Sequence, residues 1–205
     1  MSTVGRLTNL GLAQPPKWLP SCVHYETIMG SMAYGVSTDS SDFDVYGFCI
    51  PPKEDVFPHL KGEIQGFGRQ KNNFEQYSQH HLRDKDALGG KGRDYDITIY
   101  SIVKYFTLAM ENNPNIVDSL FTPATCVQTC SQIGSMVREK RRIFLHKGCW
   151  PKFKGYSFAQ LNKVYTTQND KDIVEIRRFE DEHNIDHSTT YNDLMYEIKK
   201  RDMVI

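Results

Sequence analysis

The sequence predicts an α+β protein, with strands in the first half of the chain and helices in the second. Two short segments are strand-like: residues 45–50 form an apolar run that ends at two prolines, and residues 94–100 alternate polar and apolar side chains. Two longer segments, which follow Ser101 and Ser131, repeat apolar residues at helical spacing. This order of segments indicates a sheet with helices packed on it, followed by a helical half.

The most informative stretch is residues 29–45, MGSMAYGVSTDSSDFDV, because Asp42 and Asp44 open the first strand-like run. Alternate side chains of a strand lie on one face, so these two carboxylates are expected side by side. Such a pair is unfavourable unless a cation lies between the two groups, and hard oxygen ligands suit Mg²⁺ or Mn²⁺. The pair therefore predicts a metal site at the start of a strand.

A Gly-Ser turn precedes this acidic pair by about ten residues. Gly30 allows close approach of the backbone to a ligand. Ser31 and the amides after it are expected to begin a short helix through Tyr34 that receives a phosphate. The stretch as a whole predicts a phosphate-binding turn that faces the metal site.

The second strand-like segment carries the candidates for a third carboxylate. Strand alternation places Asp94 and Asp96 on one face and Tyr95, Ile97 and Ile99 on the other. Either acidic residue can join Asp42 and Asp44 at the site.

The overall composition indicates a folded protein with no general attraction to polyanions. The chain has 205 residues, with 25 Lys+Arg and 25 Asp+Glu, so any contact with nucleic acid must come from a local patch. No apolar run reaches the roughly 20 residues of a membrane helix, and the first residues lack a secretory signal, so we expect a cytoplasmic protein with no membrane partner. The five cysteines are expected to be reduced thiols, and a zinc site at Cys126, Cys130, His146 and Cys149 has irregular ligand spacing.

Several segments outside the strands have a less distinct pattern. Residues 1–20 contain three prolines around Trp18, which predicts an extended lead-in whose aromatic ring packs on the body. Residues 66–93 are interpreted as a loop excursion, in which FEQYSQHHL forms either a helical face or an edge strand. This excursion is either a lid over the site or a solvated insertion.

The helical half supplies further candidate binding residues. Ser101 is expected to cap a helix to about residue 112, which places Lys104 in its first turn near the base of the site, either as a phosphate-binding or as a solvated lysine. A second helix is expected over residues 131–147, and its REKRR run is either a solvated face or an RNA-binding rim. A third helix, from Phe153 to Tyr165, would direct Gln160 and Lys163 toward the nucleotide.

The spaced Gly-Ser and Asp-x-Asp pair resembles the signature of the DNA polymerase beta superfamily of nucleotidyltransferases. Two downstream blocks, DYDITIYSIVKYFTLAMENNPNIVDSLF and FKGYSFAQL, look like those of predicted nucleotidyltransferases of bacteria and their phages, including the RNA-repair-associated type. The resemblance covers roughly residues 22–165. It implies a polymerase-beta-like catalytic core over residues 1–125 with a small mixed sheet, and a helical region over residues 126–205 packed on that core. The tail is shorter than in many members, which leaves open any site element that a longer tail supplies.

The resemblance also implies a mechanism, in which a nucleoside monophosphate passes from an NTP to a hydroxyl and pyrophosphate is released. Two Mg²⁺ or Mn²⁺ ions would be held by Asp42, Asp44 and Asp96, the superfamily pattern favouring Asp96 over Asp94. Gly30 and Ser31 would bind the β- and γ-phosphates, with Lys104 and Lys163 as further nucleotide contacts. The expected acceptor is the 3′ end of an RNA, with RNA or tRNA as partner. The alternatives are nucleotidylation of a protein or small molecule, and a non-catalytic nucleotide-binding module.

Overall fold

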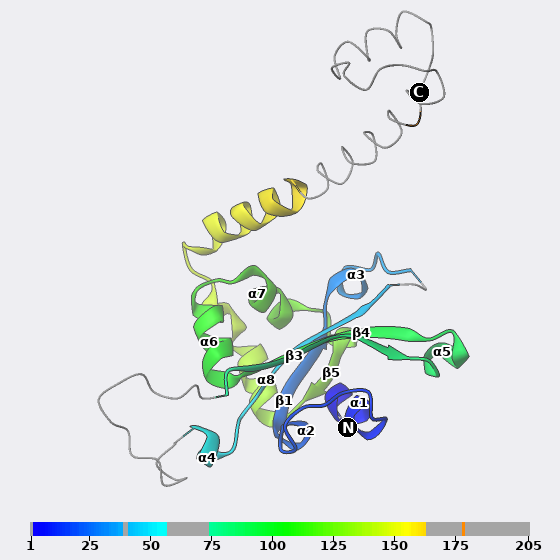
Figure 1. Ribbon diagram of the computed structural model, residues 1–205. Coiled ribbons are helices and arrows are strands. Elements are labelled where there is room, and N and C mark those ends of the chain that lie inside the picture. The colour runs from blue at the N-terminus through cyan, green and yellow to red at the C-terminus, as the bar shows by residue number, and fades with distance from the viewer. Residues whose placement is uncertain (1, 39–40, 57–73, 163–177, 179–205) are drawn as a thin grey trace, which may run out of the picture. The chain divides into compact units, whose positions relative to one another are not determined.

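A computed structural model describes residues 2–38, 41–56, 74–162 and 178 of the chain (Figure 1). The chain divides into two compact units, residues 1–153 and 154–205. The first unit extends past the boundary predicted at residue 125, because the segment after it contributes a strand to the sheet. Residues 149–162 are helical, as predicted for the third helix, and Lys163 lies outside the described residues.

The first unit is built on a five-stranded mixed sheet in the order β3-β4-β2-β1-β5. Its strands are β1 (Val23–Ile28), β2 (Phe43–Cys49), β3 (Gln76–Asp84), β4 (Arg93–Ser101) and β5 (Val127–Cys130). Strands β2 and β4 are parallel neighbours, whereas the pairs β1–β2, β1–β5 and β3–β4 are antiparallel. The strand predicted after the Gly-Ser turn and the strand predicted at residues 94–100 are confirmed, and so is the mixed sheet.

Short helices and 3₁₀ turns connect and cover the strands. They are α1 (Thr3–Asn9), α2 (Leu19–Cys22), α3 (Gly30–Ala33), α4 (Lys53–Val56), α5 (Ala87–Gly90), α6 (Ile102–Met110), α7 (Pro114–Phe121), η2 (Ala124–Cys126), α8 (Gln132–Glu139) and η3 (Arg141–Phe144). Within the described part of the chain, every helix is too short or too polar to cross a bilayer.

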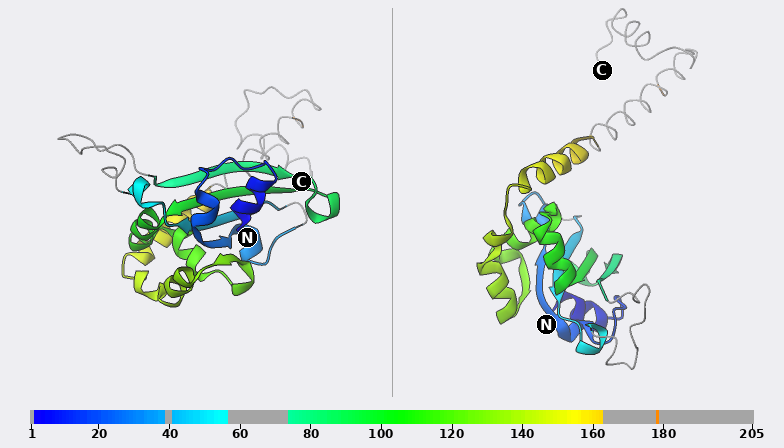
Figure 2. Two further views of the ribbon diagram at one scale, coloured as in Figure 1. Left: turned by 90° about the horizontal axis from the view of Figure 1, so that it is seen from below. Right: turned by 90° about the vertical axis from the view of Figure 1, so that its left-hand side faces the viewer.

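Apolar side chains are buried on both faces of the sheet. On one face, Val45, Ile97 and Ile99 pack with Val4, Leu7 and Leu19 of the N-terminal helices. On the other face, Tyr25 and Phe48 pack with residues of α6, α7 and η3, Tyr105 and Phe144 among them. Figure 2 shows α1 and α8 on opposite sides of β1. Because both faces are covered, the sheet is a rigid platform for polar residues at its ends.

Polar side chains fix the starts of the helices, as the sequence predicts for Ser101. Its hydroxyl accepts a hydrogen bond from the Lys104 amide and begins α6. Asn113 and Ser131 cap α7 and α8 in the same way. The His24 imidazole and the Ser131 hydroxyl share a hydrogen bond of 2.9 Å, which ties the start of α8 to β1.

Two expectations about individual segments are wrong, and for a third segment one of the two predicted alternatives is confirmed. Residues 1–20 contain the helix α1, although Trp18 does pack on the body through an edge contact with Phe74 at 4.8 Å. Within the loop excursion predicted at 66–93, residues 76–84 form the edge strand β3, one of the two alternatives for this segment. The helix expected over 131–147 ends at Glu139, and Ile143 in the 3₁₀ turn that follows is exposed.

A buried carboxyl group lies at the start of α1, and the sequence did not indicate it. Glu26 of β1 is fully buried and accepts hydrogen bonds from the Thr3 and Val4 amides at 2.6 and 3.1 Å and from the Thr129 hydroxyl at 3.2 Å. The carboxylate thus satisfies the first amides of α1, which have no partner within the helix. Burial nevertheless raises the pKa of Glu26 above its ordinary value.

Candidate functional site

The parallel pairing of β2 with β4 brings two of the predicted carboxylates together. Asp44 and Asp96 are opposite each other in the register, and Val45 is opposite Ile97. Side chains alternate along each strand, so the two aspartates lie on one face while Val45 and Ile97 are buried on the other. Asp42 precedes β2 by one residue and is exposed.

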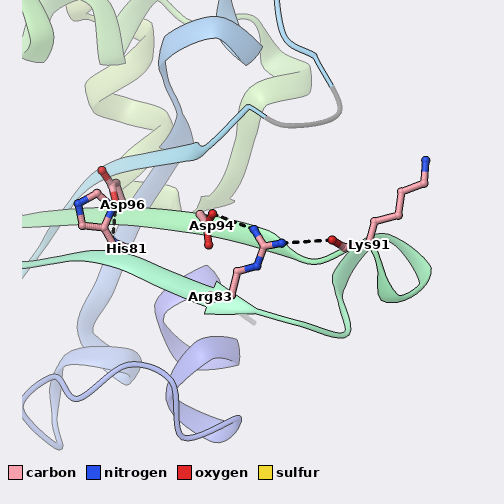
Figure 3. A network of polar contacts seen from close by, with 5 residues as sticks. All are labelled: His81, Arg83, Lys91, Asp94 and Asp96. Atoms are coloured by element: carbon pink, nitrogen blue, oxygen red, sulfur yellow. Dashed lines mark hydrogen bonds and ion pairs between the residues drawn. The ribbon is translucent and has the colours of Figure 1, made fainter.

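The edge strand β3 holds Asp96 through a bulge. Between Gln79 and Leu82 the register with β4 shifts, so His80 and His81 together occupy the place of one residue. The His81 amide donates a hydrogen bond to Asp96 Oδ1 at 2.7 Å, and His80 Nδ1 lies 3.4 Å from Asp96 Oδ2. Figure 3 shows Asp96 and His81 joined across the two strands. Both carboxylate oxygens of Asp96 therefore contact β3.

Asp94 has a different partner on the same strand pair. Its Oδ2 accepts from Arg83 Nη1 at 2.8 Å, and Arg83 Nη2 donates to the Lys91 carbonyl at 3.3 Å (Figure 3). This ion pair ties the β3–β4 hairpin together. The register places Asp96, not Asp94, beside Asp44, which agrees with the preference for Asp96 drawn from the superfamily pattern.

The carboxylates of the site repel one another. Burial raises the pKa of the Asp44 carboxyl, the negative charges of Asp96 and Asp42 raise it further, and His80 lowers it. In this arrangement of the three aspartates, the negative charge on Asp44 is therefore energetically unfavourable. A bound cation would relieve this repulsion.

The Gly-Ser turn lies directly against Asp44. The short helix predicted after β1 is confirmed as α3, and Gly30 at its start has φ +64°. A Cβ at Gly30 would be 2.3 Å from Asp44 Oδ2, so a side chain at this position would displace the carboxylate. The Met29 amide also donates to the Asp44 carbonyl at 2.7 Å. Ser31, which is partly buried, therefore lies one residue from a glycine that contacts the acidic group.

The fold does not bring Lys104 to this site, contrary to the prediction. Asp96 is near the beginning of β4, whereas Lys104 follows its end. The five residues from Asp96 to Ser101 span about 17 Å at ~3.3 Å per residue. Lys104 Nζ instead lies 3.2 Å from Glu75 Oε2. The prediction failed because the site is at the start of both parallel strands, not at the junction between strand and helix.

The donor set fits a hard divalent cation, although the side chains do not form a ready-made cluster. Among the described residues, no three His, Cys, Asp or Glu side chains are close enough together to hold a metal ion. In this arrangement the Asp96 carboxylate accepts from the His81 amide and lies beside the His80 imidazole. The oxygen chemistry and the mutual repulsion of the aspartates suit Mg²⁺ or Mn²⁺.

Sequence reasoning missed two contributors to this region. The first is the His80–His81 bulge, whose only signal in the sequence is that the strand alternation breaks between Gln79 and Leu82. The second is Tyr34, whose hydroxyl donates to Asp118 Oδ2 of α7 at 2.6 Å. No local pattern points to this contact, because the two residues are far apart in the sequence.

A mixed sheet with paired aspartates on neighbouring strands and a Gly-Ser turn against one of them defines a polymerase-beta-like nucleotidyltransferase core. The family model described as the RNA repair pathway DNA polymerase beta family, RlaP, matches residues 12–194, and the chain belongs to this family. No curated protein and no solved structure gave a match. The family links the chain to RNA repair and to the nucleotidyltransferase class of enzymes.

Proposed function

We propose that the protein transfers a nucleoside monophosphate from an NTP to the 3′ hydroxyl of an RNA, with release of pyrophosphate. The observation that carries this proposal is the register of Asp44 and Asp96, next to the Gly30–Ser31 turn. Phosphoryl transfer depends mainly on in-line positioning and on neutralisation of charge, which such a constellation can supply. The RNA acceptor is proposed from the family's place in RNA repair.

In this proposal, Asp42, Asp44 and Asp96 hold two divalent cations, Mg²⁺ or Mn²⁺. When bound, such ions neutralise triphosphate charge and lower the pKa of the attacking hydroxyl. The raised pKa of Asp44 supports a cation at this place, because a positive charge would offset the repulsion from Asp96 and Asp42. The His81 amide fixes the orientation of Asp96 by a hydrogen bond that is independent of the charge on the imidazole.

The turn after β1 is proposed to bind the β- and γ-phosphates. The absence of a side chain at Gly30 lets its backbone approach Asp44, and a triphosphate bound there would be adjacent to the cations. The Ser31 hydroxyl and the amides from Gly30 to Met32 are the proposed donors. Lys163, which lies outside the described residues, remains a proposed nucleotide contact from the sequence alone.

The test is to incubate the protein with each α-labelled NTP, with Mg²⁺ or Mn²⁺, and with total RNA, and to follow the label. Label at RNA 3′ ends supports the proposal, and its sensitivity to periodate oxidation of the RNA confirms a 3′-hydroxyl acceptor. Label on a protein or on a small molecule would show that this molecule, and not RNA, is the acceptor. No transfer with any NTP and either metal would refute the enzymatic function.

A matched pair of variants connects the activity to the site. Asp96→Ala should abolish the transfer, whereas Asp94→Ala, on the same face of the same strand but ion-paired with Arg83, should retain most of it. Equal loss in both variants, with the fold intact by circular dichroism, would contradict the assignment of Asp96. Asp42→Ala and Asp44→Ala should behave like Asp96→Ala.

A further inference from the structure

Positive charge is concentrated in residues 138–152, here called the basic segment. It runs from the end of α8 through η3 to the start of the next helix, in a chain whose total charge is zero. Its only acidic residue is Glu139, and its cations are Arg138, Lys140, Arg141, Arg142, Lys147 and Lys152. A local excess of this kind attracts polyanions although the whole chain does not.

Two arginines anchor the basic segment to α7 and are not free for a ligand. Arg138 donates a hydrogen bond to the Thr122 carbonyl, and the guanidinium of Arg141 lies 5.0 Å from the centre of the Phe121 ring. Arg141 also donates to the Arg138 carbonyl at 2.6 Å. These contacts give the segment a fixed position on the core.

The remaining cations face solvent. Lys140, Arg142, Lys147 and Lys152 are exposed, and within the described part of the chain none of them has a carboxylate within ion-pair distance. Unpaired cations on a fixed backbone suit phosphates that arrive from outside, because the protein does not already neutralise them. This distinguishes them from Arg6, Arg83 and Lys104, which are paired with Asp84, Asp94 and Glu75.

The basic segment begins at the same end of the sheet as the candidate site. Phe121, which contacts Arg141, is three residues from Asp118, which accepts from Tyr34 at the end of α3. Three residues are about one turn of α7, roughly 5 Å along its axis. In addition, the Thr122 hydroxyl is 2.6 Å from that of Thr27, near the end of β1 that leads to Gly30. A polynucleotide on the segment would therefore reach the site over a short distance.

The segment also exposes an aromatic surface. Trp150 is 75% exposed, although a ring of this size is usually buried in a folded protein. Nucleic acid bases stack on such rings without sequence preference, and stacking surfaces beside cations are the general means of binding single strands. Cations and an exposed tryptophan together fit a single-stranded RNA better than either does alone.

We infer that the basic segment binds the acceptor RNA, with Lys140, Arg142 and Lys147 on its phosphates and Trp150 on a base. The inference rests on the proposed function for the identity of the RNA as acceptor. A membrane surface is a different partner for cations beside an exposed tryptophan. RNA is preferred because the segment starts within reach of the nucleotidyltransferase site and lacks a continuous apolar face, since charged residues interrupt its exposed apolar ones.

The test measures binding of the full chain to a fluorescein-labelled 20-nucleotide single-stranded RNA by anisotropy, without NTP, over a series of salt concentrations. The triple variant K140A/R142A/K147A is compared with K17A/K53A/K85A, which removes the same charge from exposed lysines elsewhere on the first unit. The first variant should bind at least tenfold more weakly, and its plot of log K against log salt should be shallower by about 2, since each lost phosphate contact removes ~0.7. The second variant should bind like the parent chain.

Trp150→Ala should weaken binding about tenfold with an unchanged salt slope, because stacking releases no counterions. Equal effects of the two triple variants, or no RNA binding by the parent chain, would overturn the inference. Preferential binding to vesicles with anionic lipid, lost in K140A/R142A/K147A, would show that the segment binds a membrane instead of RNA.

The assay separates this inference from the proposed function because it requires no transfer. RNA binding through the segment in a chain that transfers nothing would refute the enzymatic proposal alone. Transfer to RNA with an unchanged KM for RNA in K140A/R142A/K147A would refute the binding surface alone. If both hold, this variant raises the KM for RNA with little change in kcat or in the KM for NTP.

Discussion

The carboxylate of Asp44 occupies the space that a side chain on Gly30 would need. A Cβ added to Gly30 would be 2.3 Å from Asp44 Oδ2, although the two residues belong to different elements, α3 and β2. The contact fixes the distance between the proposed phosphate-binding turn and the acidic group. Several expectations about activity and stability depend on this and similar contacts.

Gly30→Ala should reduce turnover about a hundredfold or more, because displacement of a reacting group by ~1 Å has effects of that size. It should also destabilise the fold by about 1 kcal/mol, since alanine is unfavourable at φ +64°. Gly35→Ala is the matched control, because Gly35 has φ +71° and no atom within 4 Å of an added Cβ. Equal activity in the two variants would show that the contact with Asp44 does not matter for transfer.

Asp44→Asn should raise the melting temperature at pH 7 in the absence of divalent cations while it abolishes transfer. The folded pKa of Asp44 is raised, so stability falls as the pH rises from the unfolded pKa, about 3.9, through the folded value. The amide removes this loss, so the gain should be present at pH 7 and absent below about pH 3.5. Thermal melts across pH 3–8 measure it, and an unchanged difference at every pH would contradict the electrostatic explanation.

Divalent cations should stabilise the parent chain and not Asp44→Asn. The expected shift follows RT ln(1 + [M]/Kd), so it grows with Mg²⁺ or Mn²⁺ concentration and disappears with chelator. The same melts, repeated with each ion, provide the measurement. A shift of the same size in the variant would place the stabilising ion elsewhere.

His81 of the bulge has φ +56°, a conformation that costs a non-glycine residue roughly 1–2 kcal/mol. His81→Gly should therefore keep both the fold and the turnover, since the amide that donates to Asp96 remains. His81→Val should destabilise the chain and lower kcat, because a β-branched residue disfavours this φ and the amide would move. If the His81→Gly and His81→Val variants have the same kcat, the bulge does not position Asp96.

Removal of the buried carboxylate in Glu26→Ala should destabilise the protein by about 2–5 kcal/mol. The Thr3 and Val4 amides would lose their acceptor, and a buried unpaired group costs roughly 1–3 kcal/mol. Glu75→Ala should change the stability by less than about 0.5 kcal/mol, because its pair with Lys104 is largely exposed. Urea denaturation of both variants compares the two values.

The central part of the site could be predicted because its signals are local. Strand alternation predicts Asp44 and Asp96 on the polar faces of their own strands, and both patterns depend only on neighbouring residues. The cap at Ser101 was accessible for the same reason. The superfamily pattern then supplied what alternation cannot, the choice of Asp96 over Asp94.

The features that were missed depend on contacts between distant residues. Lys104 was placed at the site because the direction of β4 relative to β2 is not encoded in either strand alone. The helix after Ser131 ends early because Phe144 is drawn into the core, where Asn112 donates to its carbonyl at 2.6 Å. The burial of Glu26 depends on its contact with α1, and no local pattern around Glu26 indicates this contact. In each case a tertiary contact overrides the local preference.

The parallel pairing of β2 with β4 has a consequence for how the protein matures. Asp44 and Asp96 are 52 residues apart in the sequence. The strand β3, which lies between them in the sequence, must also pair with the other edge of β4. Closing so long a stretch of chain is entropically slow compared with forming a hairpin. Catalytic activity should therefore appear among the last events of folding. The rate at which activity returns during refolding would then report the rate at which the sheet is completed.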